Sequence, residues 1–168
     1  LKIAKSFNGK ILTLKRSKKI SNDKATSEVA IRHALKWYEK KFTQVHYIVL
    51  LQPTSPFRTL KTIKKCLKEI KNPKINIVIT VKKMNSEGKQ KRLFQLVKNK
   101  FCLEKRVFKQ NKTKYITNGL LYLIKKSFFE KNKNLTPSRF KPVIINSKKE
   151  NIDIDTINDW NYAQKFIK

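Results

Sequence analysis

The chain has 168 residues, of which 41 are Lys or Arg and 11 are Asp or Glu, giving a formal net charge of +30. With 39% hydrophobic residues, this length suits one globular domain with its own core. No apolar run approaches the roughly 20 residues of a membrane-spanning helix, so we expect no membrane partner. Cys66 and Cys102 lie far apart without metal-ligand spacing, which is typical of reduced cysteines in a cytoplasmic protein.

The excess of basic residues by itself suggests nucleic acid or another anionic surface as a partner. However, 35 of the 41 basic residues are Lys and only six are Arg, and the lysines are spread over every segment. Proteins that read bases rely on Arg side chains for bidentate contacts, and the six Arg residues form no cluster in the sequence. We therefore interpret the charge as a solvated basic surface and keep a basic nucleic-acid-binding module as the alternative.

The first segments of the chain have the patterns of a helix, a strand, a loop and a second helix. Residues 1–7 are typical of the last turns of a helix that Asn8-Gly9 would end, and 11–14 is a predicted strand. A polar loop then leads into the second helix, with Asp23 or Thr26 as its N-cap. The apolar positions of this helix fall on one face: Ile31, Ala34, Leu35, Tyr38 and Phe42.

A strand, a loop bracketed by prolines and a helix follow. The apolar run over 47–51 predicts a buried strand, and Pro53 and Pro56 then fix φ and remove two backbone donors. The other loop residues carry uncharged hydrogen-bonding side chains: Gln52, Thr54 and Ser55. Thr59 can cap a helix with Cys66 on its core side or flank. The apolar positions of this helix are Leu60, Ile63, Leu67 and Ile70. This order places the loop at the carboxyl end of a strand, where α/β sheets bind ligands, although many such loops only connect.

The remainder of the chain continues to alternate strands with helices. Strands are predicted over 75–81, 93–97, 119–124 and 143–145, and a short helix over 125–133. Asn118-Gly119 opens the third of these strands with a pair that tolerates unusual backbone angles. The alternation indicates an α/β fold with a mostly parallel sheet that helices cover on both faces.

The segment 150–159 is the strongest candidate site, because it holds four of the 11 acidic residues and no Lys or Arg. Alternation in 152–155 directs the carboxylates of Asp153 and Asp155 to one side of an extended segment. Two such carboxylates repel each other unless a cation lies between them, and carboxylates plus substrate phosphates suit Mg²⁺. Ion pairs with nearby lysines are the alternative. Thr156 and Asp159 are typical of a helix start. Four apolar residues of that helix are expected to face inward: Ile157, Trp160, Ala163 and Ile167.

Three segments, in order along the chain, carry a resemblance to one enzyme family. Leu50 to Thr59 is similar to the LLQPTSPLRT signature of the CMP-sialic acid synthetases, the acylneuraminate cytidylyltransferases. Residues 115–122 are similar to the family's YxxNGAIY strand, and residues 152–156 to its IDIDT segment. The resemblance implies a three-layer α/β/α fold with the mostly parallel sheet of nucleotide-diphospho-sugar transferases. It also implies a single domain over 1–168 that is N-terminally truncated, lacking a first strand and a glycine-rich nucleotide-binding loop.

The resemblance assigns roles residue by residue. Asp153 and Asp155 would be the catalytic, Mg²⁺-binding carboxylates. The substrate-binding residues would be Gln52, Thr54, Ser55, Pro56, Arg58, Asn118, Gly119 and Tyr122. The nucleotide-binding residues would be Asp23, Ala25 and Thr26. Region 82–114 would be an excursion that pairs with a second subunit and borders the sugar site, where Lys109 or Arg106 would replace the family's usual Arg.

These roles imply transfer of CMP from CTP to a sialic-type nonulosonic acid, an acidic nine-carbon sugar, with release of pyrophosphate. The expected protein is a Mg²⁺-dependent, cytoplasmic homodimer that serves surface polysaccharide biosynthesis. A cytidylyltransferase for pseudaminic, legionaminic or 3-deoxy-octulosonic acid is the nearer alternative, and nucleic-acid binding is the more distant one. Without the nucleotide-binding loop, we expect the chain on its own to have little or no activity.

Overall fold

The computed structural model describes Ser6 and residues 11–22, 24–84, 94–97, 100–103, 113–137 and 139–167. These residues belong to two compact units, Leu1–Val45 and His46–Lys168, and each unit is described by itself. None of the helices in the described ranges combines the length and the apolar character that crossing a membrane requires.

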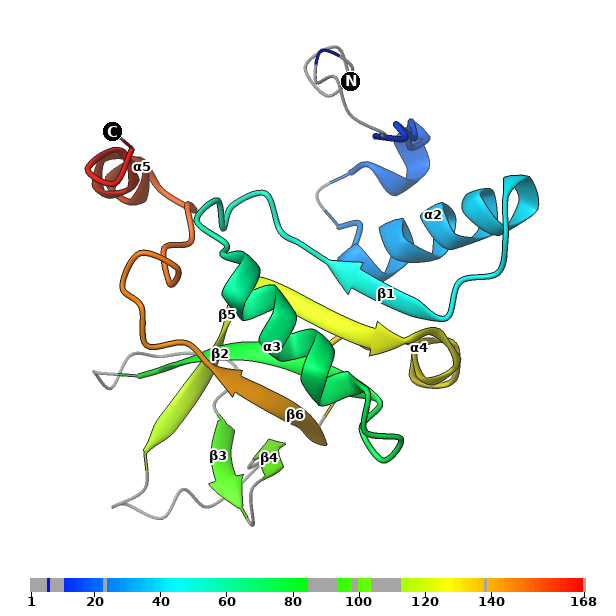
Figure 1. Cartoon of the computed structure of the whole chain (residues 1–168). Coiled ribbons are helices and arrows are strands. Elements are labelled where there is room, and N and C mark those ends of the chain that lie inside the picture. Colours follow the sequence, from blue (N-terminus) through cyan, green and yellow to red (C-terminus); the bar gives the residue numbers. More distant parts are fainter. Residues whose placement is uncertain are drawn as a thin grey trace. The chain divides into compact units, whose positions relative to one another are not determined.

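The N-terminal unit contains a short 3₁₀ helix, η1 (Lys18–Ile20), and an α-helix, α2 (Ser27–Lys41) (Figure 1). The predicted strand over 11–14 is wrong, because these residues adopt no regular structure and lie outside every strand pairing of the described sheet. The predicted helix end over 1–9 lies outside the described residues apart from Ser6. Helix α2 is confirmed and Thr26 is its N-cap residue, although the Thr26 side chain makes no capping hydrogen bond.

The second unit is built on a mixed sheet. Its described strands have the order β1-β5-β2-β6-β4-β3, and β3 also pairs with the start of β5, so the sheet curls back on itself. The strands are β1 (Tyr47–Leu50), β2 (Ile77–Lys83), β3 (Phe94–Val97), β4 (Lys100–Leu103), β5 (Lys114–Lys125) and β6 (Arg139–Ile144). The helices are α3 (Leu60–Ile70), α4 (Lys126–Asn132) and α5 (Ile157–Gln164).

Strand direction explains both the agreement and the difference between this sheet and the predicted one. Strands β2 and β6 pair in parallel, and β1 and β2 both pair antiparallel with β5, so β1, β2 and β6 run in the same direction. The α/β class is therefore confirmed. The expectation of mostly parallel pairing is wrong, because β5 runs in the opposite direction between β1 and β2.

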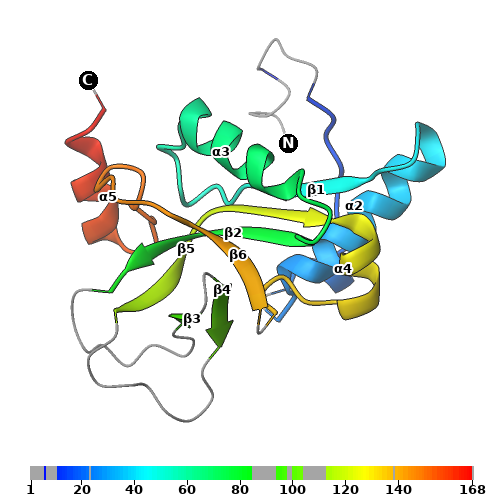
Figure 2. The ribbon, with the colours of Figure 1, turned by 60° about the horizontal axis from the view of Figure 1, so that its bottom comes forward.

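Helix α3 lies across β2, β5 and β6 (Figures 1 and 2), and the core between them is apolar. This core contains Cys66, Ile70, Val78, Leu120, Leu121, Leu123, Val143 and Ile145. Each of these residues is at most 5% exposed, so the core is closed to water. The strand residues between these positions, including Ile77, Ile79 and Ile124, are buried on the opposite face. Burial on both faces explains why β2 and the second half of β5 are continuous apolar runs instead of alternating ones.

Three predicted apolar faces differ from the observed ones. Strand β1 was expected to be buried, yet Tyr47 and Val49 are 49% and 45% exposed, because successive side chains point to opposite faces and only the face of Ile48 is covered. Helix α3 buries Thr62, Cys66 and Ile70, whereas Leu60 and Leu67, two of the apolar positions identified in the sequence, are exposed. On α5 only Ala163 is buried, so the inward orientation predicted for three residues is wrong: Ile157, Trp160 and Ile167.

Burial predicts that the Cys66 thiol is unreactive in the folded protein. Desolvation raises the pKa of Cys66 to about 12, so very little of the reactive thiolate exists below pH 9. We expect iodoacetamide at pH 8 to leave Cys66 unmodified in the native chain and to alkylate it fully in urea, which peptide mass spectrometry measures. Rapid native labelling of Cys66 would contradict its place in the core.

Candidate active site

A bulge in β5 lies at the centre of the candidate site. The register between β2 and β5 shifts here, so that Thr80 alone faces residues 118–121. The Thr80 hydroxyl restores the interrupted ladder, because it accepts a hydrogen bond from Leu121 N at 2.9 Å and donates to Leu121 O at 3.1 Å. The prediction that Asn118-Gly119 opens a strand is therefore wrong, since the pair bends a longer strand in its middle.

Gly119 is the point at which three distant segments of the chain meet. Its φ is +71°, in the left-handed region that favours glycine. A Cβ at this position would collide with Gln52 Oε1 and would lie 3.1 Å from Asp153 Oδ2 and 3.2 Å from Ser55 Oγ. Only hydrogen at this position leaves room for oxygens from three side chains. The three motifs identified in the sequence are thus in contact in the fold.

The loop after β1 is fixed to both of the other motifs. Ser55 is fully buried, and its hydroxyl lies 3.4 Å from Asn118 O and 3.4 Å from Asp153 Oδ1, within range of long hydrogen bonds. The backbone amide of Ile154 donates to Thr54 O at 2.8 Å. The loop and the acidic segment therefore lie side by side at the carboxyl ends of β1 and β6, where the sequence predicted a site.

Arg58 acts as a clip within this loop. Its Nη2 donates to Gln52 O at 2.7 Å and its Nε donates to Leu120 O at 2.8 Å, so one guanidinium joins the two ends of the loop to β5. Partial burial lowers the pKa of Arg58 from its ordinary value, but the group stays charged at neutral pH. These bonds give Arg58 a structural role, and its predicted contact with substrate stays a prediction.

Replacing Arg58 by Lys is expected to lower the free energy of unfolding by about 1–3 kcal/mol. A single ammonium group cannot donate to the Gln52 and Leu120 carbonyls in the fork geometry that the guanidinium provides. Urea unfolding followed by circular dichroism measures the loss. Arg139→Lys on the exposed start of β6 is the matched control and is expected to change stability by less than about 0.5 kcal/mol. Equal losses in the two variants would contradict the clip.

Two of the four acids in segment 150–159 have structural roles. Glu150 Oε1 accepts from the Thr59 amide at 3.1 Å and from the Thr59 hydroxyl at 2.8 Å, which ties the segment to the start of α3. Thr156 and Asp159 form a capping box at the start of α5, as the sequence predicted. Hydrogen bonds from Thr156 hold the pKa of Asp159 below its ordinary value.

The other two acids, Asp153 and Asp155, are the predicted metal ligands. Asp153 is half-buried beside Gly119 and Ser55, whereas Asp155 is exposed. Across the described ranges, no three His, Cys, Asp or Glu side chains gather in a way that could hold an ion. The two carboxylates are oxygen donors of the kind that Mg²⁺ takes together with substrate phosphates and water, and their coordination of this ion stays a prediction.

The Asn118 side chain is already engaged within the protein. It is 1% exposed, its Nδ2 donates to Asn151 Oδ1 at 2.7 Å, and its Oδ1 accepts from Leu120 N at 3.3 Å. Asn151 in turn donates to Ile145 O at 2.8 Å. Asn151 was not predicted from the sequence, because nothing in the pattern of residues 146–151 distinguishes it from a loop asparagine. It fixes the bulge to the end of β6.

The remaining predicted site residues belong to β5, to the loop after β1 and to the N-terminal unit. Tyr122 is 7% exposed and pairs with Leu50 of β1, so the structure places its ring among buried residues. Thr54 is half-buried and Pro56 is exposed on the loop. Ala25 and Thr26 belong to the N-terminal unit and precede α2. Three predicted residues lie outside the described ones: Asp23, Arg106 and Lys109.

Comparison with known proteins identifies the family to which this chain belongs. The chain is 30% identical over 156 residues to CMP-N,N'-diacetyllegionaminic acid synthase of Legionella pneumophila, covering 88% of this chain and 67% of the relative. The chain belongs to the CMP-sialic acid synthetase family. This is a family of nucleotidyltransferases, and membership favours an enzyme over a nucleic-acid-binding module.

Further comparisons agree with this assignment. The chain is 28% identical over 165 residues to N-acylneuraminate cytidylyltransferase of Escherichia coli, covering 96% of this chain but only 38% of that protein. No protein-family model matches the chain. Two solved structures share the fold. One is a CMP:2-keto-3-deoxy-manno-octonic acid synthetase complexed with CTP, with a TM-score of 0.61, 8% identity and coverage of 86% and 69% of the two chains. The other is 4-diphosphocytidyl-2C-methyl-D-erythritol synthase from Anaerococcus prevotii, with a TM-score of 0.63, 17% identity and coverage of 99% and 74%.

Proposed function

We propose that this family member transfers CMP from CTP to a sialic-type nonulosonic acid and releases pyrophosphate. The main observation that supports this proposal is that side-chain oxygens of Gln52, Ser55 and Asp153 meet around Gly119. It is supported by relatives that are named as synthases of CMP-activated acid sugars. A solved cytidylyltransferase complexed with CTP also shares the fold.

In the proposed reaction, the anomeric hydroxyl of the sugar attacks the α-phosphate of CTP and pyrophosphate leaves. Asp153, with Asp155, would hold Mg²⁺, which supplies neutralising charge beside the phosphates when it is bound. The half-buried Gln52 carboxamide offers a donor and an acceptor that would orient the sugar or the nucleotide beside Asp153, and the buried Ser55 hydroxyl would hold the Asp153 carboxylate in place. Arg58 and Asn118 keep these groups in place, since phosphoryl transfer depends mostly on positioning and electrostatics.

The identity of the sugar is open between the nonulosonic acids and the shorter 3-deoxy-octulosonic acid. We favour a nine-carbon acid because both curated relatives are named for such sugars. We further propose that the protein works as a cytoplasmic homodimer, in which region 82–114 provides the contact between subunits. The described strands of that region, β3 and β4, pair with each other and also with β5 and β6, so they extend the same sheet.

A panel of acid sugars incubated with CTP and Mg²⁺ tests the proposal. The panel contains N-acetylneuraminic, N,N'-diacetyllegionaminic, pseudaminic and 3-deoxy-octulosonic acids, and mass spectrometry detects the CMP-sugars. We expect one nine-carbon acid to be preferred by about tenfold or more. Because the chain covers 67% and 38% of its two relatives, equilibrium binding of CTP and of each sugar is measured alongside turnover. Absence of both binding and product with every sugar would contradict the proposal.

A further inference from the structure

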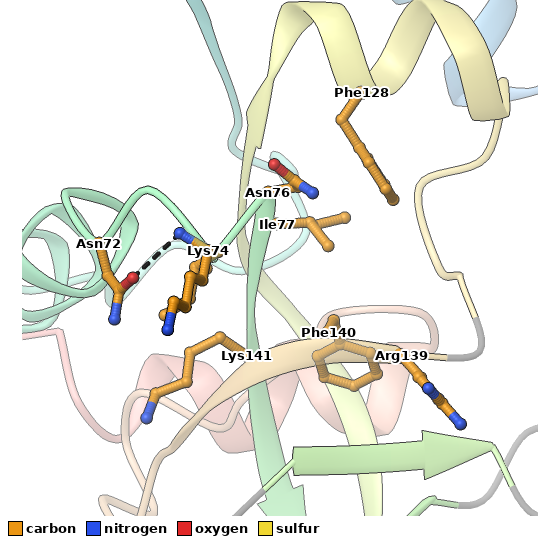
Figure 3. A pocket seen from close by; sticks show the side chains of 9 residues that line it. Asn72, Lys74, Asn76, Ile77, Phe128, Arg139, Phe140 and Lys141 are labelled. Atoms are coloured by element: carbon orange, nitrogen blue, oxygen red, sulfur yellow. Dashed lines mark hydrogen bonds between the residues drawn. The ribbon is translucent and has the colours of Figure 1, made fainter.

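A cavity at the edge of the sheet opposite the candidate active site has the lining of a small-molecule site (Figure 3). Its volume is about 430 Å³, within the range of sites for small ligands. One wall is formed by four residues between α3 and β2 and by the first residue of β2: Asn72, Lys74, Ile75, Asn76 and Ile77. Another wall is formed by Arg139, Phe140 and Lys141 of β6. Phe128 of α4 closes the cavity from above in Figure 3.

The position of the cavity separates it from the cluster around Gly119. Ile77 is the first residue of β2, and Arg139 to Lys141 begin β6, so the cavity lies at the amino ends of these parallel strands. The candidate active site lies at their carboxyl ends, where Ile145 holds Asn151. No residue is shared between the two places.

The rim of the cavity carries a net positive charge. Lys74, Arg139 and Lys141 line it, and Figure 3 shows the Lys74 and Lys141 side chains extending on the same side of it. Glu69 Oε2 lies 3.3 Å from Lys141 Nζ and neutralises one of these charges. In the described part of the chain, Lys74 and Arg139 have no carboxylate partner. Like charges held around one cavity repel each other, and an anion between them would relieve that repulsion.

The floor of the cavity is apolar and partly aromatic. Ile77 and Phe140 are 2% and 5% exposed, and the half-buried Phe128 ring points toward Ile77 (Figure 3). Because Ile77 and Phe140 are almost fully covered already, the half-buried Phe128 ring is the main apolar surface offered to a ligand. A hydrated inorganic ion would leave that ring uncovered, whereas a ligand with an aromatic body would bury it. Aromatic surface beneath Arg and Lys side chains favours an aromatic or apolar body that carries a phosphate or carboxylate group.

We propose that this cavity is a second ligand site, which binds a small organic anion with an aromatic body independently of the candidate active site. Phenyl phosphate is the probe, because it unites the two features of the ligand class, whereas phenol and inorganic phosphate each carry one. In the full chain, titration followed by two-dimensional ¹H–¹⁵N NMR is expected to shift the amides of Ile77, Phe128, Phe140 and Lys141 saturably. Phenol and inorganic phosphate are each expected to bind more weakly than phenyl phosphate by about tenfold or more.

A charge-matched control is essential in a chain of net charge +30. The double variant Arg139→Gln/Lys141→Gln is expected to weaken phenyl phosphate binding by about tenfold or more. The double variant Lys61→Gln/Lys65→Gln changes two exposed lysines in the first half of α3, outside the cavity lining, and is expected to leave binding unchanged. Phe128→Leu, which keeps the charge, is expected to weaken phenyl phosphate but not inorganic phosphate. Three results would each overturn the proposal. They are equal weakening in both double variants, amide shifts that spread over the lysine-rich surface, and binding of phenol as tight as that of phenyl phosphate.

Discussion

Replacing Asp153 by Asn is expected to lower CMP transfer by about 10²–10³-fold while the fold stays intact. Asp153 places a carboxylate oxygen beside Gly119 and Ser55, and the amide of Asn occupies the same space without the negative charge. Loss of that charge removes the group proposed to hold Mg²⁺ against the phosphates. Pyrophosphate release from CTP with the preferred sugar, relative to the wild-type chain, measures the effect. Because turnover by this chain on its own is expected to be low, Mg²⁺-dependent binding of CTP is the second readout and is expected to weaken in the same variant.

Asp159→Asn is the matched control for this prediction. It removes one negative charge from the same segment, but Asp159 serves the start of α5. We expect transfer to stay within about threefold of wild type in this variant. Stability should fall slightly, because capping interactions of this kind make modest contributions. Equal loss of transfer in the Asp153 and Asp159 variants would show that the segment acts only through its net charge.

Replacing Gly119 by Ala is expected to disrupt the site far more than the fold. A non-glycine residue at a φ of +71° costs roughly 1–2 kcal/mol, so the chain should still fold. The new Cβ would displace the end of the Gln52 side chain and press against Asp153 and Ser55. Because a small misplacement of reacting groups can cost about 10²-fold, we expect a loss of transfer of that order.

A variant of similar stability separates these two effects. Ile70→Val shortens a buried side chain of α3 away from the site and is expected to cost about 0.5–1.5 kcal/mol. Urea unfolding should therefore give similar midpoints for Ile70→Val and Gly119→Ala, while transfer is lost only in the latter. Normal transfer by Gly119→Ala would contradict a site built around this glycine.

The sequence predicted the elements better than it predicted their faces. Apolar runs and caps located β1, α3, β2 and α5, because local patterns report on local structure. The same patterns left the buried stripe of α3 ambiguous, since Leu60, Ile63 and Leu67 have a helical spacing as regular as that of Thr62, Cys66 and Ile70. Which stripe is buried depends on contacts with β2, β5 and β6, and no local pattern encodes these.

The residues of the candidate site could be predicted from the sequence, but the bulge and the hydrogen bonds that hold them together could not. Three motifs pointed to Gln52, Ser55, Gly119 and Asp153 through a family resemblance, and the fold brings these residues together. The bulge that joins them was not predictable, because it depends on Thr80 replacing ladder hydrogen bonds across the sheet. The roles of Arg58 and Asn151 also depend on partners more than 30 residues away in sequence.

Charge was the feature most open to misinterpretation. A net charge of +30 is typical of nucleic-acid-binding proteins, yet the relatives of this chain are enzymes of sugar activation. The informative signal was local, because the segment 150–159 is free of Lys and Arg in an otherwise basic chain. Within that segment, Asp153 contacts both of the other motifs, because its Oδ1 lies 3.4 Å from Ser55 Oγ and its Oδ2 borders Gly119.

Paramagnetic broadening by Mn²⁺ in the presence of CTP tests most directly whether Asp153 and the residues around Gly119 form one metal-assisted site. Mn²⁺ replaces Mg²⁺ at oxygen ligands and broadens the NMR signals of nearby amides. We predict selective broadening of Ser55, Gly119 and Asp153 in the wild-type chain and its loss in Asp153→Asn. The account would be contradicted if these three amides were not broadened in the wild-type chain, or if their broadening persisted unchanged in Asp153→Asn.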